Sequence, residues 1–138
     1  MDETMIPEKE EKKLYELLDF KITDIETHVG QSLHADSLHL KMENRMGTQM
    51  STEEEGVVFI YVNYRIHDGD DGLFLFDIST LSTIRLPEGE KEINESNVKD
   101  CSVIATDSTI KAIYSITESM GIAPIDLRPK DPHAHHHS

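Results

Sequence analysis

The stretch VVFIYVNYRI, residues 57–66, carries the strongest strand pattern of the chain. Its even-numbered residues are apolar throughout, from Val58 to Ile66, and its odd-numbered residues are apolar as far as Tyr61. Side chains that repeat with period two are typical of a β-strand. Because both faces carry apolar groups, the pattern predicts a strand in the middle of a sheet that is covered on both sides.

The segments that follow predict a hairpin. The turn sequence DGDDG, residues 68–72, supplies the Asp and Gly residues that a tight turn needs. The second arm, residues 73–86, places Phe74, Phe76 and Ile78 on one face. Leu75 and Asp77 lie on the other face, and residues 87–95 form a polar connection.

Two more strands are predicted upstream. Apolar residues alternate with polar ones from Leu38 to Met46, which indicates a half-buried strand, and residues 47–56 are expected to be a polar connection. Residues 20–29 also form a strand pattern, but its phase changes between Ile22 and Ile25. A phase change inside a strand indicates a bulge or a bend.

Helical patterns stand at both ends of the chain. Pro7 suits a first helical position, and residues 8–18 predict a short amphipathic helix whose apolar face is formed by Leu14, Leu17 and Leu18. A second helix begins near Ser96 or Asn97 and ends at Gly121. Its predicted core stripe comprises Val98, Cys101, Ala105, Ala112, Ile113, Ile116 and Met120. Residues outside that stripe are candidates for a subunit interface: Val103, Ile110 and Tyr114.

These elements predict an α+β fold in which a four-stranded antiparallel sheet carries a long C-terminal helix on one face, with an extra short N-terminal helix. A single domain is expected over residues 7–129, after a loose acidic tail at residues 1–6. Residues 130–138 are a polar, His-rich tail of the kind that a cloning tag leaves.

Composition argues for a protein-binding role in the cytoplasm. The 138 residues carry a formal net charge of −14, which repels nucleic-acid phosphates and anionic membranes, and either steers basic partners or serves solubility alone. Cys101 is the single cysteine, so no intrachain disulfide is possible and a reducing compartment is expected. The sequence shows neither a signal peptide nor a run of apolar residues long enough to span a membrane.

No motif predicts catalysis, a cofactor or a metal site. The acidic turn of Asp68, Asp70 and Asp71 lacks the later Glu and the flanking helices of a calcium loop. The tail histidines have no Cys or acid at ligand spacing, and Cys101 falls on the core stripe, where packing is the expected role. We therefore expect a protein that is not an enzyme and uses no cofactor.

The end of the chain resembles the SecB family of protein-export chaperones, including the SecB-like chaperones linked to toxin–antitoxin systems. The segment TIKAIYSITESMGIAPIDLRP, residues 109–129, is similar to the family's long helix and the turn that follows it, with matches at Met120, Gly121, Pro124, Leu127 and Pro129. The segment FLFDI, residues 74–78, is similar to the family's F-L-x-E-V. In place of the family's further C-terminal helix, this chain is expected to end in its polar tail.

The resemblance implies a chaperone that binds unfolded clients, in protein export or for one dedicated client such as an antitoxin, and that assembles as a homodimer or homotetramer. It implies that Leu75 and Asp77, with Asp24, meet the motor protein SecA. Residues proposed for a client groove between helix and sheet are Phe20, Tyr61, Phe74 and Phe76. The alternative is an adaptor without catalytic activity that kept the fold and binds one defined partner.

Overall fold

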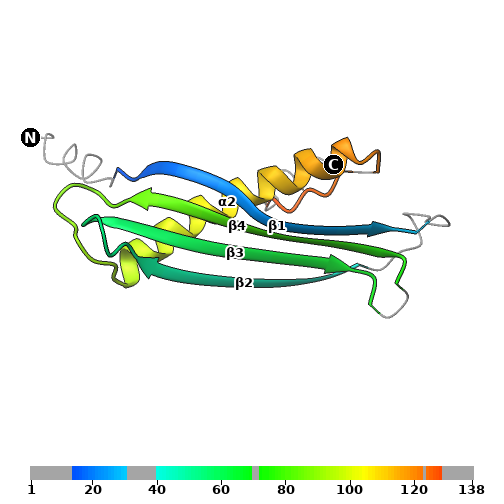
Figure 1. Ribbon diagram of the computed structural model, residues 1–138, viewed down its shortest axis with the longest axis horizontal. Helices are drawn as coiled ribbons and strands as arrows, with labels where there is room; N and C mark the ends of the chain where they lie inside the picture. Colours follow the sequence, from blue (N-terminus) through cyan, green and yellow to red (C-terminus); the bar gives the residue numbers. More distant parts are fainter. Residues whose placement is uncertain (1–13, 31–39, 70–71, 123, 129–138) are drawn as a thin grey trace, which may run out of the picture.

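The computed structural model of the chain describes residues 14–30, 40–69, 72–122 and 124–128. Its elements are β1 (Glu16–Val29), β2 (Lys41–Met50), β3 (Val57–His67), β4 (Phe74–Arg85) and α2 (Glu95–Ser119). The strands form one sheet in the order β1-β4-β3-β2, and every neighbouring pair is antiparallel (Figure 1). The predicted four-stranded antiparallel sheet with a long C-terminal helix is therefore confirmed.

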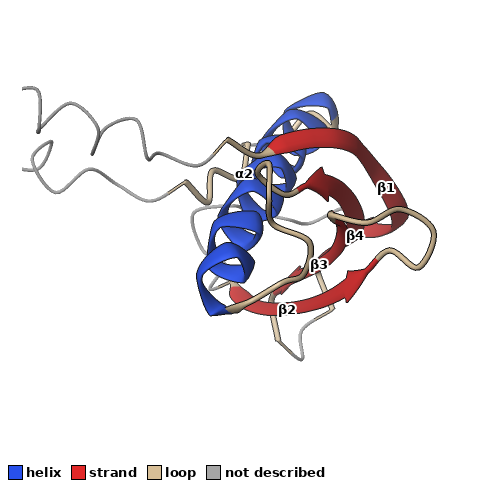
Figure 2. Cartoon of the chain, turned by 90° about the vertical axis from the view of Figure 1, so that its left-hand side faces the viewer, coloured by secondary structure: helices blue, strands red, loops and turns tan. Residues whose placement is uncertain are grey.

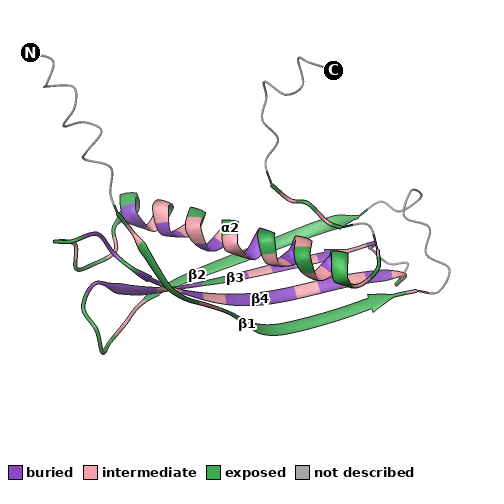
Figure 3. Ribbon diagram, turned by 90° about the horizontal axis from the view of Figure 1, so that it is seen from above, coloured by how far each residue is buried: buried purple, intermediate pink, exposed green. Residues whose placement is uncertain are grey.

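The molecule has two layers. Figure 2 shows the sheet curved, with α2 on its concave side, and Figure 3 shows the same two layers from above. The helix lies against β3 and β4, the two central strands. The edge strands β1 and β2 extend beyond the strip that α2 covers, and both are largely exposed (Figure 3).

The core lies between α2 and the central strands. The even-numbered residues of β3 and β4 face the helix, and Ile60, Phe76 and Ile78 have no exposed surface. After α2, the chain turns at Gly121, which has a positive φ of 82°, and its next apolar residues pack against the core. The backbone N–H of Ile125 donates a hydrogen bond to Thr117 Oγ1 at 2.9 Å, which ties this C-terminal segment to the helix.

The prediction that the central strand is covered on both faces is wrong within a single chain. The helix and the C-terminal segment cover one face, which we call the helix face. The other, which we call the open face, leaves the Tyr61 side chain 42% exposed. The apolar odd-numbered residues of β3 therefore do not indicate a second layer that covers the sheet.

The prediction of an N-terminal helix over residues 8–18 is also wrong for the residues that the structure describes. Residues 16–18 belong to β1, where Leu17 pairs with Ile84 of β4. Pairing along an existing strand gives these residues a ladder of hydrogen bonds that a short isolated helix cannot match. The register shift between Leu17 and Asp19 leaves Leu18 without a partner residue on β4.

The predicted fault in the first strand is confirmed as a bulge. The register of β1 against β4 shifts between Ile22 and Asp24, which leaves Thr23 without a partner residue. Ile22 pairs with Thr80 and Ile25 pairs with Ile78, both on the helix face. The bulge thus brings two apolar groups that were out of phase in the sequence to the same side of the sheet.

The second strand is longer than predicted. Residues 47–50, expected to be a connection, continue β2 in unbroken register with β3, and Met50 pairs with Val58. Their polar composition is compatible with a strand at the edge of a sheet, where one face meets water. The predicted residues Leu38 and His39 lie outside the described part of the chain.

The turn between β3 and β4 depends on a buried carboxylate. Asp68 Oδ2 accepts a hydrogen bond from the backbone N–H of Leu73 at 2.8 Å. Burial alone raises the pKa of Asp68, but hydrogen bonds from the backbone N–H groups of Leu73, Phe74, Asp68 and Gly72 outweigh it and lower the pKa below its ordinary value. Asp68 therefore has a structural role in the hairpin that the sequence predicted.

Helix α2 begins two or three residues earlier than a cap at Ser96 or Asn97 would place it. Asn94 is the N-cap, and its Oδ1 accepts from the backbone N–H of Asn97 at 2.9 Å. In return Asn97 Oδ1 accepts from the Asn94 backbone N–H at 2.6 Å, which completes a capping box. The amide of Asn97, fully buried, donates to Glu90 Oε1 and to the Glu92 carbonyl.

The Asn97→Ala variant should lower the free energy of unfolding by about 1–3 kcal/mol, because it leaves buried hydrogen-bonding groups without partners. Urea unfolding followed by circular dichroism measures the change. Lys99→Ala, at an exposed position two residues along the helix, is the control and should change stability little. Equal stability of the two variants would contradict a structural role for Asn97.

The Asp68→Asn variant should be less stable than the parent at pH 7. Because the native pKa of Asp68 is depressed, its carboxylate stabilises the native chain fully above the unfolded-state pKa, near ~4, and this contribution disappears as the pH falls through the native pKa. The difference between variant and parent should therefore shrink below about pH 4. A difference in unfolding free energy that is the same at pH 7 and pH 3 would show that ionisation of Asp68 does not matter.

Candidate functional site

The first candidate surface is a line of apolar residues on the helix face of β1. Through their partners on β4, Leu17, Ile22, Ile25 and Val29 all lie on this face, and they are between 36% and 43% exposed. Phe20 lies among them and is half-buried. We call these five residues the β1 row. They remain exposed because α2 packs against β3 and β4 and not over the edge strand.

The second candidate surface is a line of methionines on the helix face of β2. Met42, Met46 and Met50 pair with Ile66, Val62 and Val58, which face the helix. Met42 is 51% exposed, Met46 is 41% exposed and Met50 is half-buried. We call these three residues the β2 row. Asn44 and Thr48 lie between them on the same face.

The two rows flank the helix on the same side of the sheet. An extended apolar surface on a chain of this size indicates contact with another molecule. Methionine side chains are flexible and polarisable, so a methionine surface adapts to partners of different shape. The arrangement therefore fits the binding of other polypeptides better than the binding of a small polar ligand.

A third surface lies on the outer side of α2. Val103, predicted to lie at a subunit interface, is 61% exposed and lines a shallow, mostly apolar hollow with Ile110 and Arg128. The Arg128 guanidinium lies 5.5 Å from the centre of the Tyr114 ring and is held by Asp126 at 2.6 Å. The hydrogen bonds from Arg128 lower the pKa of Asp126 to about 2.

The prediction of Ile110 as a surface residue is wrong, because its side chain is 7% exposed within its own chain. Arg128, at the end of the described C-terminal segment, lines the same two hollows as Ile110. Ile110 belongs to the core cluster, against which Ile122, Ile125 and Leu127 of the chain end pack. Val103 and Tyr114 remain accessible.

The four aromatic residues predicted for one client groove are separated by the fold. Phe74 and Phe76 are buried beneath α2 and cannot reach a partner. Phe20 belongs to the β1 row on the helix face, whereas Tyr61 lies on the open face, where its hydroxyl is 3.1 Å from Ser79 Oγ. The sequence did not identify the exposed residues Ile22, Ile25, Met42 and Met46 as site residues. Their exposure follows from their place on edge strands, which only the structure shows.

The open face brings together the three residues predicted to meet a motor protein. Leu75, Asp77 and Ser79 alternate along β4 on this face, and Asp24 of β1 pairs with Ser79. Asp77 is already engaged inside the chain: its carboxylate accepts hydrogen bonds from Asn63 at 2.8 Å and from Arg65 at 2.9 Å. The open face is thus a polar, hydrogen-bonded surface, unlike the helix face.

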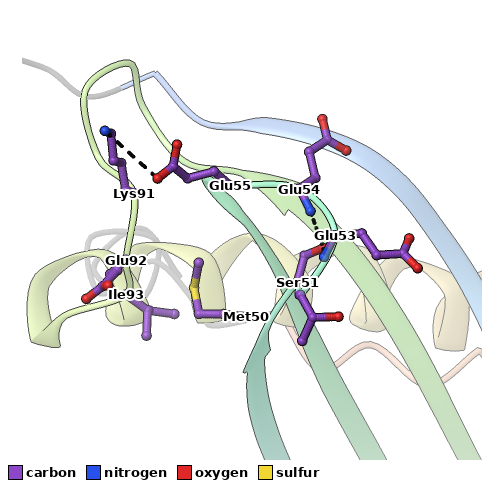
Figure 4. Close-up of a pocket in the computed structure, with 9 residues that line it drawn as sticks. Met50, Ser51, Glu53, Glu54, Glu55, Lys91, Glu92 and Ile93 are labelled. Atoms are coloured by element: carbon purple, nitrogen blue, oxygen red, sulfur yellow. Dashed lines mark hydrogen bonds and ion pairs between the residues drawn. The ribbon is translucent and has the colours of Figure 1, made fainter.

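A hollow of about 460 Å³ lies where β2 ends (Figure 4). Figure 4 shows Met50 and Ile93 on one side of it and the carboxylates of Glu53, Glu54 and Glu55 around it. Lys91 lies 3.9 Å from Glu55, and this long ion pair neutralises only part of the negative charge. The hollow is acidic, and among the described residues no group of three or more side chains is placed to hold a metal ion.

The single cysteine has the environment of a packing residue. Cys101 is fully buried on the helix stripe, and burial, together with the nearby charges of Asp100 and Glu90, raises the pKa of its thiol to about 11. The neighbouring residue Asp100 accepts a hydrogen bond from the Tyr15 hydroxyl at 2.6 Å, which ties the residue before β1 to α2. A thiol in this state is a poor nucleophile.

Comparison with known proteins shows the fold. No family model and no curated protein matches the sequence. The solved structure of a SecB-like chaperone from Mycobacterium tuberculosis, in complex with a ChAD peptide from the HigA1 antitoxin, aligns with a TM-score of 0.65. The alignment covers 94% of this chain and 100% of that one at 10% identity.

A second solved structure, of a protein of unknown function from Streptococcus agalactiae, aligns with a TM-score of 0.53 and 10% identity. That alignment covers 85% of this chain and 98% of the other. The chain thus has a SecB-like α+β fold, as its resemblance to that family predicted. In the described part of the chain, no helix has both the length and the apolar character needed to cross a membrane.

Cys101 in the native protein should react with a thiol reagent such as DTNB only as fast as the chain unfolds, because the thiol is buried and its ionisation is disfavoured. The absorbance of the released thiolate at pH 8 measures the rate. Urea should accelerate labelling in parallel with unfolding. Fast, stoichiometric labelling of the native protein would contradict the burial of Cys101.

Proposed function

We propose that this protein is a SecB-like chaperone that binds extended, non-native segments of other polypeptides in the cytoplasm. The observation that carries the proposal is the pair of exposed apolar rows that flank α2 on a SecB-like fold. Such rows offer a client broad apolar contact without a deep pocket, which favours weakly selective binding. The proposal requires neither a cofactor nor a catalytic residue.

The dedicated form of this function is binding to one client. The mycobacterial neighbour was solved with an antitoxin peptide, so an antitoxin is the first candidate client for this chain as well. Protein export is the other form, and there the open face with Leu75, Asp77 and Asp24 is the proposed contact for SecA. Because Arg65 already neutralises Asp77, a basic partner group would have to share or displace that ion pair.

Assembly into a homodimer or homotetramer belongs to the same proposal. The exposed Val103 and the half-buried Tyr114 supply apolar surface on the outer side of α2, and the β1 row supplies more at the sheet edge. A second copy seated on either surface would bury apolar groups that the single chain leaves in water.

The pure protein should suppress the aggregation of a chemically unfolded client at a stoichiometric ratio, as measured by light scattering on dilution. Replacing Ile22, Ile25, Met42 and Met46 together by serine should abolish suppression, because both rows lose their apolar groups. Leu14→Ser removes an exposed apolar group outside the rows and outside the proposed subunit interface, and it is the control. Circular dichroism verifies that both variants are folded.

If the parent protein leaves aggregation unchanged, the chaperone proposal fails. The adaptor alternative would then predict that one defined folded partner is recovered in a pull-down. Recovery of many unrelated unfolded chains would instead support the chaperone.

A further inference from the structure

We infer that the free edge of β2 accepts an extended client segment as an additional strand, and that this segment alternates apolar with acidic residues. The inference rests on the proposed function and assigns strand addition by the client to the β2 row, while the β1 row keeps its apolar contact with the rest of the client. It follows from the regularity of β2, from its methionines and from the charges on its open face.

The first argument concerns the backbone of the two sheet edges. β1 has two irregularities, at Leu17/Asp19 and at Ile22/Asp24, and bulges on an edge strand interrupt the hydrogen-bond ladder that an added strand needs. β2 pairs with β3 over ten residues, from Lys41 to Met50, without a shift. Its outer edge therefore presents a regular series of backbone donors and acceptors over about 34 Å.

The second argument concerns the helix face of β2. Met42, Met46 and Met50 alternate there with Asn44 and Thr48, so an added strand would find apolar contacts at every second position of its own helix face. Methionines accommodate Leu, Val or Phe in the incoming strand with little loss of packing. This face therefore favours apolar residues in the added strand without preferring one apolar residue type over another.

The third argument concerns charge on the open face of β2. Lys41 and Arg45 lie there, and neither forms an ion pair with another described residue. Glu43, between them, is 3.4 Å from His67 Nε2 of β3. The β1 edge has the opposite character, since Glu16, Asp19, Asp24 and Glu26 share its open face with Lys21 and His28.

The two cations of β2 are four residues apart, about 14 Å along the strand. In an added strand, acidic residues at the same spacing would lie opposite them, and cross-strand pairs of opposite charge stabilise such a pairing. The acid between them would lie opposite Glu43, so an alternating strand gains two attractive pairs against one repulsive pair. The apolar residues at the alternate positions would then face the β2 row. A strand with lysines in place of the acids would be repelled by Lys41 and Arg45.

Fluorescence anisotropy with labelled ten-residue peptides tests this inference. An alternating Leu/Glu peptide should bind the parent protein at least tenfold more tightly than a Leu/Lys peptide or a Leu/Glu peptide of shuffled order. Methylation of the backbone nitrogens on one edge of the Leu/Glu peptide should weaken binding at least tenfold, because it removes hydrogen bonds and leaves the side chains unchanged.

The protein variants give the sharper comparison. Lys41→Glu with Arg45→Glu should reverse the preference, so that the Leu/Lys peptide binds more tightly than the Leu/Glu peptide. Met42→Ser with Met46→Ser should weaken the binding of both peptides at least tenfold. Ile22→Ser with Ile25→Ser, in the β1 row at the other edge of the sheet, should weaken it much less. Lys99→Glu with Lys111→Glu, which reverses two exposed charges on α2, is the charge-matched control and should not reverse the preference.

A preference that survives the charge reversal, or binding lost through the β1 row but not through the β2 row, would overturn the inference. Suppression of aggregation without binding of any of these peptides would overturn it as well, while leaving the proposed chaperone function in place. If the β2 variants dissociate an oligomer and leave peptide binding unchanged, the β2 row is an interface between copies and the inference fails.

Discussion

The structure depends on one constraint: a single helix is too narrow to cover the whole face of a four-stranded sheet. Because α2 lies against β3 and β4, the helix-face side chains of those strands form the core, and most of the same face of β1 and β2 remains in water. Apolar residues continue across all four strands on that face, so the apolar surface is wider than its cover. The proposed binding of polypeptides is a direct consequence of this excess.

Local irregularities decide which residues meet the solvent. The unpaired Thr23 aligns Ile22 with Ile25 on the helix face of β1, and without it Ile25 and Val29 would point to the open face. The same irregularity makes β1 a poor template for another strand. β2 has no such interruption, so the two edges of one sheet differ in what they can bind.

The helix accommodates polar residues in the core because their hydroxyl groups form hydrogen bonds within the chain. Thr109 Oγ1 donates to the Ala105 carbonyl and lies 2.8 Å from Thr80 Oγ1, and Thr117 Oγ1 bonds to the Ile113 carbonyl. A stripe drawn from apolar residues alone contains Cys101, Ala105 and Ile113 but misses both threonines. Hydroxyl groups that return their hydrogen bonds to the helix behave as packing residues.

The sequence by itself determined the central hairpin, the bulge, the long helix with its end at Gly121, and the α+β class, because each depends on period, turn chemistry or capping within a short window. Tertiary structure alone decided that residues 16–18 extend a strand, that Ile110 is covered, and that Met42 and Met46 are exposed. Burial depends on which distant segment of the chain packs on a residue. The single helix α2 packs on β3 and β4 and is too narrow to cover the edge strands as well. No local pattern in the sequence records that width.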